Sequence, residues 1–99
     1  MEPRVVEPSP DAPCICTIVN QRGLHARAAA RFVKLAETFD ADVKVSKDDL
    51  SVNGTSILGL MMLAAGIGSE VVLEASGPEA GQALDALSDL IARGFDEQD

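Results

Sequence analysis

The 99-residue sequence contains no tryptophan and no tyrosine, and its only aromatic residues are three phenylalanines. The core therefore has to be built from aliphatic side chains, and the chain offers no aromatic platform on which nucleic-acid bases could stack. Basic residues are also few, because eight stand against sixteen acidic residues and the net charge is −8. This balance argues against a broad polyanion-binding surface and against a small nucleic-acid module of the split βαβ type.

Long hydrophobic runs are absent, and the N-terminus lacks a basic segment followed by an apolar core. We therefore expect neither membrane insertion nor secretion, and a cytoplasmic location. The only two cysteines, Cys14 and Cys16, are two positions apart in an apolar stretch that is typical of a strand. Such positions are poorly placed for a disulfide, and a single histidine does not complete a zinc site. The sequence predicts no metal and no other cofactor.

The length allows one domain. Four of the five prolines precede residue 14, so residues 1–13 are predicted to be a disordered proline-rich arm. The domain is expected to span residues 14–94, and residues 95–99 to form a short acidic tail.

Hydrophobic periodicity predicts strands over 14–19, 42–47, 50–52 and 70–76. Helices are expected from about residue 26 to 38 or 39, over the apolar segment 57–63, and after Gly77-Pro78-Glu79 as far as Arg93-Gly94. The order β-α-β-β-α-β-α is typical of an α+β fold with an antiparallel sheet and helices packed on one face.

The expected helix after residue 26 is amphipathic. Its apolar residues recur at helical spacing, whereas its basic residues lie on the opposite side; the first set is Ala29, Phe32, Val33 and Ala36, and the second Arg27, Arg31 and Lys34. The last helix has an apolar stripe of the same kind, formed by Ala80, Ala83, Leu84, Leu87 and Ile91.

His25, the only histidine, is expected where a glycine turn becomes this helix. A helix N-terminus attracts anions through its free N–H groups and its dipole, and Arg27 adds a guanidinium suited to phosphate. An imidazole nitrogen there could accept a phosphoryl group as a nucleophile. The simpler alternative is that His25 is only a polar capping residue.

The charge distribution favours the first hypothesis without deciding it. Residues 21–47 contain six basic and three acidic residues, so the basic side chains cluster around His25 in an otherwise acidic chain. An ordinary solvated helix face would give the same count.

Three segments resemble the HPr family of histidine-containing phosphocarriers. The sequence Gly-Leu-His-Ala-Arg-Ala-Ala over 23–29 resembles the active-site motif of that family, residues 39–43 resemble the segment leading into its second strand, and residues 52–61 resemble its second signature region. The resemblance extends from about Cys14 to Arg93. It implies an open-faced β-sandwich, with a four-stranded antiparallel sheet and three helices on one face.

By this resemblance the chain is a carrier of the phosphoenolpyruvate-dependent phosphotransferase system rather than an enzyme. Enzyme I would phosphorylate His25 on Nδ1, Arg27 would help to hold the phosphate, and a IIA domain would receive it. One departure stands at Ala28, where the family usually has proline; we expect only a small loss of rigidity at the helix entry.

Ser56 supports two interpretations. A serine before an apolar helix is the expected N-cap, and the resemblance also makes it a candidate for regulatory phosphorylation by HPr kinase/phosphorylase. The helix that follows is apolar all round and cannot bury every face in a domain this small. Leu60 and Leu63 are expected in the core, whereas the resemblance places Ile57, Leu58 and Met61, together with Arg31, at the partner-binding surface.

Two functions thus remain open. The first is a phosphocarrier with a transient phosphohistidine at His25, and the second is a regulatory binding module of the same fold controlled through Ser56. Small size and a single active helix end favour a monomer.

Overall fold

A computed structural model describes residues 13–97. The predicted arm over residues 1–13 therefore lies outside the described residues, except for its last position. Within the described part, four strands and three helices follow in the predicted order and end in a 3₁₀ turn. The strands are β1 (Cys14–Thr17), β2 (Asp42–Lys47), β3 (Leu50–Asn53) and β4 (Glu70–Ser76); the helices are α1 (Ala26–Ala36), α2 (Ile57–Met62) and α3 (Ala80–Ala92), and η1 covers Gly94–Asp96.

The four strands form one antiparallel sheet in the order β1-β4-β2-β3. Strand β4 is central and pairs with β1 on one side, with Cys16 opposite Val71, and with β2 on the other, with Val45 opposite Leu73. Residues of β4 alternate between buried and exposed positions, as expected for a strand with one face on the core. The antiparallel sheet with three helices is thereby confirmed.

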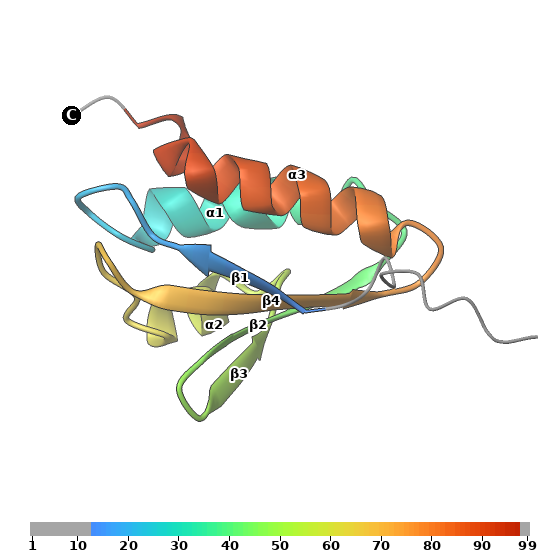
Figure 1. Cartoon of the computed structure of the whole chain (residues 1–99), viewed down its shortest axis with the longest axis horizontal. Coiled ribbons are helices and arrows are strands. Elements are labelled where there is room, and N and C mark those ends of the chain that lie inside the picture. The colour runs from blue at the N-terminus through green and yellow to red at the C-terminus, as the bar shows by residue number, and fades with distance from the viewer. Residues whose placement is uncertain (1–12, 98–99) are drawn as a thin grey trace, which may run out of the picture.

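Helices α1 and α3 lie side by side across one face of the sheet and run in opposite directions (Figure 1). The C-terminal end of α3 therefore lies beside the N-terminal end of α1. The predicted apolar stripes of both helices are buried, and Ala28 and Leu90 join them. Because Phe32 and Phe95 are among the largest fully buried side chains, two of the three aromatic residues anchor this helical layer.

Several element boundaries differ from those predicted. Strand β1 ends at Thr17 because its partner β4 begins opposite that residue, at Glu70. Helix α1 ends at Ala36 with Glu37 as its C-cap, so residues 38 and 39 form a turn. Helix α3 begins at Ala80, two residues beyond Pro78, with Glu79 as its N-cap residue.

The packed domain extends beyond residue 94, the predicted boundary with an acidic tail. Phe95 is completely buried, and η1 and Glu97 continue the folded chain. The residues from Gly94 to Asp96 all have positive φ, of 67°, 58° and 60°. This left-handed turn folds the chain back after α3 and places Glu97 against His25 at the start of α1.

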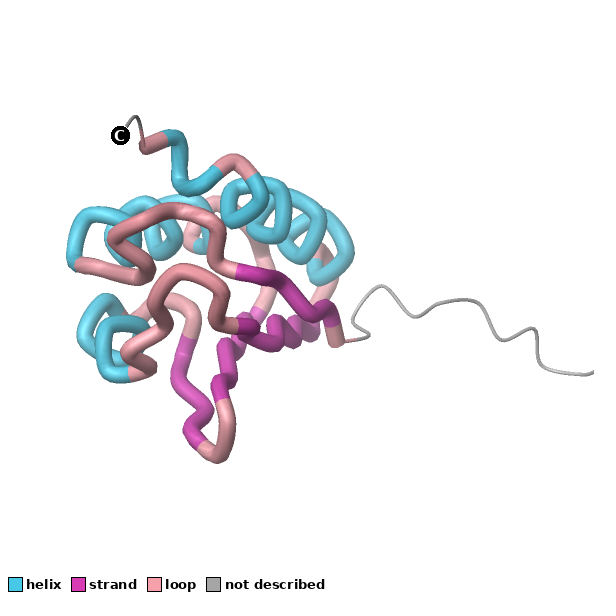
Figure 2. The backbone as a smooth tube through the Cα atoms, turned by 60° about the vertical axis from the view of Figure 1, so that its left-hand side comes forward, coloured by secondary structure: helices cyan, strands magenta, loops and turns pink. Residues whose placement is uncertain are grey.

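Two loops that are distant in sequence lie next to one another at this end of the molecule. Figure 2 shows the loop between β1 and α1 beside the loop between α2 and β4. Backbone hydrogen bonds join them: Ile18 donates to Ser69, Gly68 donates to Ile18, and Leu24 donates to Ala65, at 2.8, 2.8 and 2.9 Å. The start of α1 is thus supported by a part of the chain that is forty residues further on.

Candidate functional site

His25 is the N-cap residue of α1. Its backbone is extended, with φ −78° and ψ −179°, and its carbonyl oxygen accepts the first helical hydrogen bond from Ala29 at 2.8 Å. Its ring atom Nδ1 accepts a hydrogen bond from the backbone N–H of Arg27 at 3.3 Å. The imidazole therefore takes the place that a serine or aspartate oxygen usually occupies at a helix start. His25 thus caps the helix, and the cap also directs Nδ1 toward the positive end of the helix dipole.

The turn before His25 is fixed by a close backbone approach. Gly23 has φ +66°, and a Cβ atom added there would lie 2.4 Å from the carbonyl oxygen of Ala65. Only glycine satisfies both conditions without strain. Leu24 is buried next to it, so the ring of His25, whose side chain is 25 % exposed, is presented at the surface from a rigid base.

The two arginines of the predicted site have different surroundings. Arg27 is exposed beside His25 in the first turn of α1. Arg31, one turn later, donates a hydrogen bond from Nη1 to the carbonyl oxygen of Phe95. Arg31 thereby ties α1 to the turn that follows α3, a role that the sequence pattern did not indicate.

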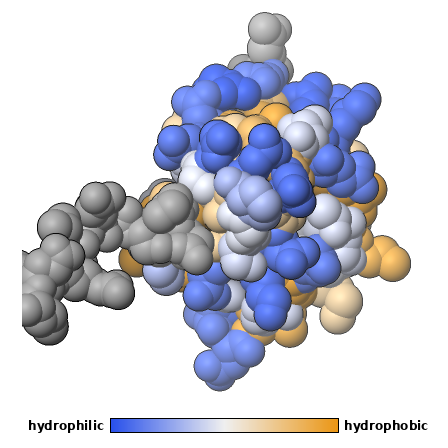
Figure 3. Space-filling model, turned by 90° about the vertical axis from the view of Figure 1, so that its right-hand side faces the viewer, coloured by the Kyte–Doolittle hydropathy of each residue, from blue (hydrophilic) through white to orange (hydrophobic). Residues whose placement is uncertain are grey.

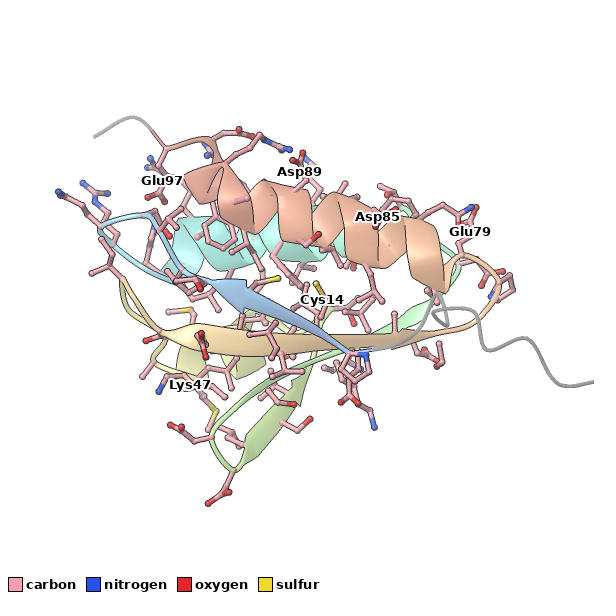
Figure 4. All side chains as sticks on the ribbon, in the orientation of Figure 1. Cys14, Lys47, Glu79, Asp85, Asp89 and Glu97 are labelled. Atoms are coloured by element: carbon pink, nitrogen blue, oxygen red, sulfur yellow. The ribbon has the colours of Figure 1, made fainter. Side chains whose placement is uncertain are left out.

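Glu97 reaches the histidine from the C-terminal segment. Its Oε2 contacts Nε2 of His25, and its Oε1 accepts a hydrogen bond at 3.0 Å from Nδ2 of Asn20, a buried side chain. Figure 4 shows Glu97 beyond the end of α3, at the opposite end of the molecule from Glu79. The carboxylate is itself only 9 % exposed.

The surroundings of Glu97 favour its ionised form. Burial raises the pKa of the carboxyl, but the hydrogen bonds from Asn20 and His25 and the nearby charge of Arg22 lower it more. The pKa of Glu97 therefore lies below its usual range, and near neutral pH the group is a carboxylate that only accepts hydrogen bonds.

The N-terminus of α2 repeats the capping arrangement with a hydroxyl group. Ser56 has extended backbone angles, φ −111° and ψ 109°, and its Oγ accepts a hydrogen bond from the N–H of Gly59 at 2.9 Å. The predicted N-cap is confirmed. Its hydroxyl is half-buried within the turn that opens the helix.

Helix α2 exposes most of its apolar side chains. Leu60 is fully buried and Leu63 nearly so, as predicted, whereas large hydrophobic side chains gather on the outer side of the helix and the loop that follows it. These are Ile57, Leu58, Met61, Met62 and Ile67, and their exposed fractions range from 40 % to 74 %. By contrast, mostly hydrophilic side chains cover the end of the molecule seen in Figure 3. The exposed apolar residues are defined here as the α2 surface.

Comparison with known proteins agrees with this architecture. A family model described as "PTS HPr component phosphorylation site" matches residues 14–93. The phosphocarrier protein HPr of Cupriavidus necator is 53 % identical over 81 residues, which are 82 % of this chain and 91 % of that protein. The chain belongs to the HPr family.

Solved structures of HPr proteins show the same fold. The crystal structure of HPr-C-His from Thermoanaerobacter tengcongensis has a TM-score of 0.83 and 41 % identity, and the match covers 88 % of this chain and 98 % of that one. An HPr dimer from the same organism has a TM-score of 0.70 and 39 % identity, with 98 % and 100 % of the two chains covered. This HPr-family chain is a phosphocarrier of the phosphotransferase system, a stoichiometric carrier rather than an enzyme.

Ala28, which stands where the family usually has proline, is fully buried in the first turn of α1. Its methyl group packs in the core, and the helix still begins at Ala26 with His25 as its cap. The helix entry therefore forms without the ring of a proline, and the small loss of rigidity expected there stays a prediction.

The structure adds two residues to the neighbourhood of His25 that sequence reasoning missed. Asn20 directly follows the first predicted strand and was given no role, and Glu97 was assigned to the acidic tail. Neither belongs to the segments that carry the family resemblance, and Glu97 is 72 positions from His25. No local pattern identifies a contact of that separation; it depends on the left-handed turn after α3.

The two cysteines form no disulfide, and their Sγ atoms lie 3.8 Å apart. Burial, followed by the neighbouring charge and hydrogen bond of Cys14, raises the pKa of the Cys16 thiol to about 12. Cys16 is thus an unreactive core residue. In the part of the chain that the structure describes, His, Cys, Asp and Glu form no group of three that could hold a metal ion. None of the helices described is long and apolar enough to cross a membrane.

Proposed function

We propose that His25 carries the phosphoryl group, on Nδ1, and that it receives the group from phospho-enzyme I and passes it to a IIA domain. The observation that carries this proposal is the position of the single histidine. Its side chain caps α1, its ring is accessible, and Nδ1 faces the helix-start N–H of Arg27. A phosphoryl group on Nδ1 would lie at the positive end of the helix dipole, where backbone N–H groups stabilise anions.

Arg27 is assigned the stabilisation of the phosphoryl oxygens. Its guanidinium is exposed next to His25, and a planar fork of N–H donors matches the geometry of phosphate. Arg31 is assigned to the partner-binding surface as predicted. Since one N–H of its guanidinium is engaged by Phe95, only its remaining donors are available to a partner.

The α2 surface is assigned to the docking of enzyme I and IIA domains. Ile57, Leu58 and Met61 are exposed there, and flexible methionine side chains suit a surface that has to fit several partners. Helix α2 contacts α1, so a partner that covers this surface can also reach His25. The carrier is proposed to work as a monomer in the cytoplasm.

Phosphorylation of Ser56 by HPr kinase/phosphorylase remains a prediction. A phosphate on its Oγ would add a dianion beside Ile57 and Leu58, at the edge of the α2 surface, and would oppose the docking of a partner. The alternative in which the chain acts chiefly as a regulatory binding module has no observation in its favour.

The proposal is tested by intact-protein mass spectrometry after incubation with phosphoenolpyruvate and enzyme I. Wild type is expected to gain one acid-labile phosphate, and His25→Ala none. Ser56→Ala serves as the matched control at the other capped helix and should be labelled like wild type. Stable labelling of a folded His25→Ala variant would contradict the assignment of His25.

A further inference from the structure

The C-terminal segment adopts a costly backbone conformation in order to reach His25. Phe95 and Asp96 have positive φ without being glycine, and each such residue costs about 1 kcal/mol. Burial of the Phe95 ring and the hydrogen bond from Arg31 to the Phe95 carbonyl hold the turn in place. This turn brings the Glu97 carboxylate into contact with Nε2 of His25.

The side chain of Asn20 holds the Glu97 carboxylate in place. Its buried Nδ2 donates both to Glu97 Oε1, at 3.0 Å, and to the carbonyl oxygen of Gly23, at 2.9 Å, in the turn that leads to His25. Two acceptors at this atom determine which end of the amide faces them. Among the described residues, Asn20 Oδ1 is buried without a hydrogen-bond partner. A buried polar atom without a partner costs stability. The position of this amide therefore satisfies the acceptors of Glu97 and Gly23 and leaves its own oxygen without a donor.

The contacts at the two ring nitrogens are complementary. Nε2 faces Glu97 Oε2, and an ionised carboxylate can only accept, so Nε2 has to carry a hydrogen. Nδ1 faces the N–H of Arg27, which can only donate, so Nδ1 has to present its lone pair. Both contacts therefore select the same neutral tautomer, with the hydrogen on Nε2.

We propose that Glu97 is a positioning residue that holds His25 in the Nε2–H tautomer and thereby makes Nδ1 the nucleophilic nitrogen. This inference rests on the proposed role of His25 as the phosphoryl acceptor. The Nδ1 lone pair forms the new N–P bond, the bond from phosphorus to the donor atom of phospho-enzyme I breaks, and its electron pair stays on that atom. The proton on Nε2 does not move. The ring becomes positively charged, and the carboxylate at Nε2 stabilises that charge while the N–H of Arg27 can turn to a phosphoryl oxygen.

The test compares Glu97→Gln with Asp96→Asn. Both substitutions exchange a carboxylate for an amide of the same shape, but Asp96 pairs with the exposed Arg93 and not with His25. In Glu97→Gln one side-chain oxygen has to serve two donors, Asn20 and His25, so the contact at one of them is lost. Glu97→Ala removes both contacts and is the second variant.

The first readout is the nitrogen NMR spectrum of the imidazole, which is unambiguous because the chain has one histidine. At a pH where the imidazole is neutral, wild type and Asp96→Asn are expected to show the Nε2–H tautomer, and both Glu97 variants a mixture of the two tautomers. The second readout is the initial rate of phosphorylation by enzyme I, which should fall about tenfold in Glu97→Ala and remain unchanged in Asp96→Asn.

The inference is overturned if the Glu97 variants match Asp96→Asn in tautomer or, where wild type is labelled, in rate. The NMR arm needs no phosphoryl donor, so it decides whether Glu97 controls the ring even if the proposed function fails. Absence of labelling in wild type would count against the proposed function alone. A change in both readouts at equal thermal stability is the result that a merely structural role for Glu97 would not give.

Discussion

The N-cap residues of α1 and α2, His25 and Ser56, each accept a hydrogen bond from the helix backbone through the side chain. The two helix starts differ in the contacts around the cap residue. His25 follows a turn at Gly23 that packs against the loop at Ala65, and its ring contacts the carboxylate of Glu97. Ser56 precedes a helix of six residues, of which only Leu60 is buried. The helix of His25 has eleven residues and buries five of them.

The difference indicates that the two helices serve different purposes in this phosphocarrier. The proposed phosphoryl acceptor has to hold its ring in one orientation, and contacts from the neighbouring Arg27 N–H and from the distant Glu97 carboxylate provide that. A surface that binds several partners benefits from side chains that can repack, and the exposed α2 surface provides them. In the proposed function, the same capping chemistry therefore supports a fixed phosphorylation site at one helix and an adaptable docking surface on the other.

The largest expected effect is a loss of stability at the junction before α1. In Gly23→Ala the new Cβ would overlap the Ala65 carbonyl oxygen, and the positive φ would be strained as well. The free energy of unfolding should fall by about 3 kcal/mol, as measured by denaturant titration. Gly66→Ala is the matched control in the neighbouring loop, because its Cβ would meet nothing within 4 Å. Equal stability of the two variants would show that the junction is not rigid.

A smaller effect, confined to partner binding, is expected on the α2 surface. Leu58 is 74 % exposed, so Leu58→Asp should leave stability within about 0.5 kcal/mol of wild type. It should weaken binding to enzyme I about tenfold, measured by calorimetry. Ile15→Asp carries the same change at an exposed position in β1, a strand at the opposite edge of the sheet from α2 and β3. Similar losses from both variants would mean that the α2 surface is not the docking site.

The smallest effect is expected at the cap of α2. Ser56→Ala removes the acceptor for the Gly59 N–H and should lower the free energy of unfolding by about 1 kcal/mol. Ser56→Asp restores an acceptor and should recover most of that loss. Thermal unfolding of the three proteins checks this order, and an unchanged Ser56→Ala variant would show that the cap contributes nothing to stability.

Local patterns predicted the fold correctly wherever a segment buries one face. Strands β2 and β4 have the predicted bounds, and every residue of the two predicted helical stripes is buried. The errors lie at the ends of elements. Strand β1 is shorter than its apolar stretch because its pairing with β4 stops at Thr17, and pairing depends on another segment of the chain.

Within the site, the sequence located His25 and Arg27 because a glycine, a histidine and an amphipathic helix are adjacent along the chain. It did not reveal Asn20 or Glu97. Asn20 looks like an ordinary turn residue, and its burial follows from the loops and the C-terminal segment that cover it. Glu97 looks like part of a solvated acidic tail, and no spacing rule connects it to a residue 72 positions earlier.

The sequence by itself therefore determined the order of the elements, the buried face of each and the place of the histidine at a helix start, since these depend on periodicity and on neighbours along the chain. Tertiary structure alone decided what contacts Nε2 of the imidazole. The antiparallel packing of α1 and α3 brings the C-terminal end of α3 beside the N-terminal end of α1. The turn at Phe95 then places the Glu97 carboxylate against Nε2 of His25. Such contacts arise from the packing of whole elements, which local sequence does not encode.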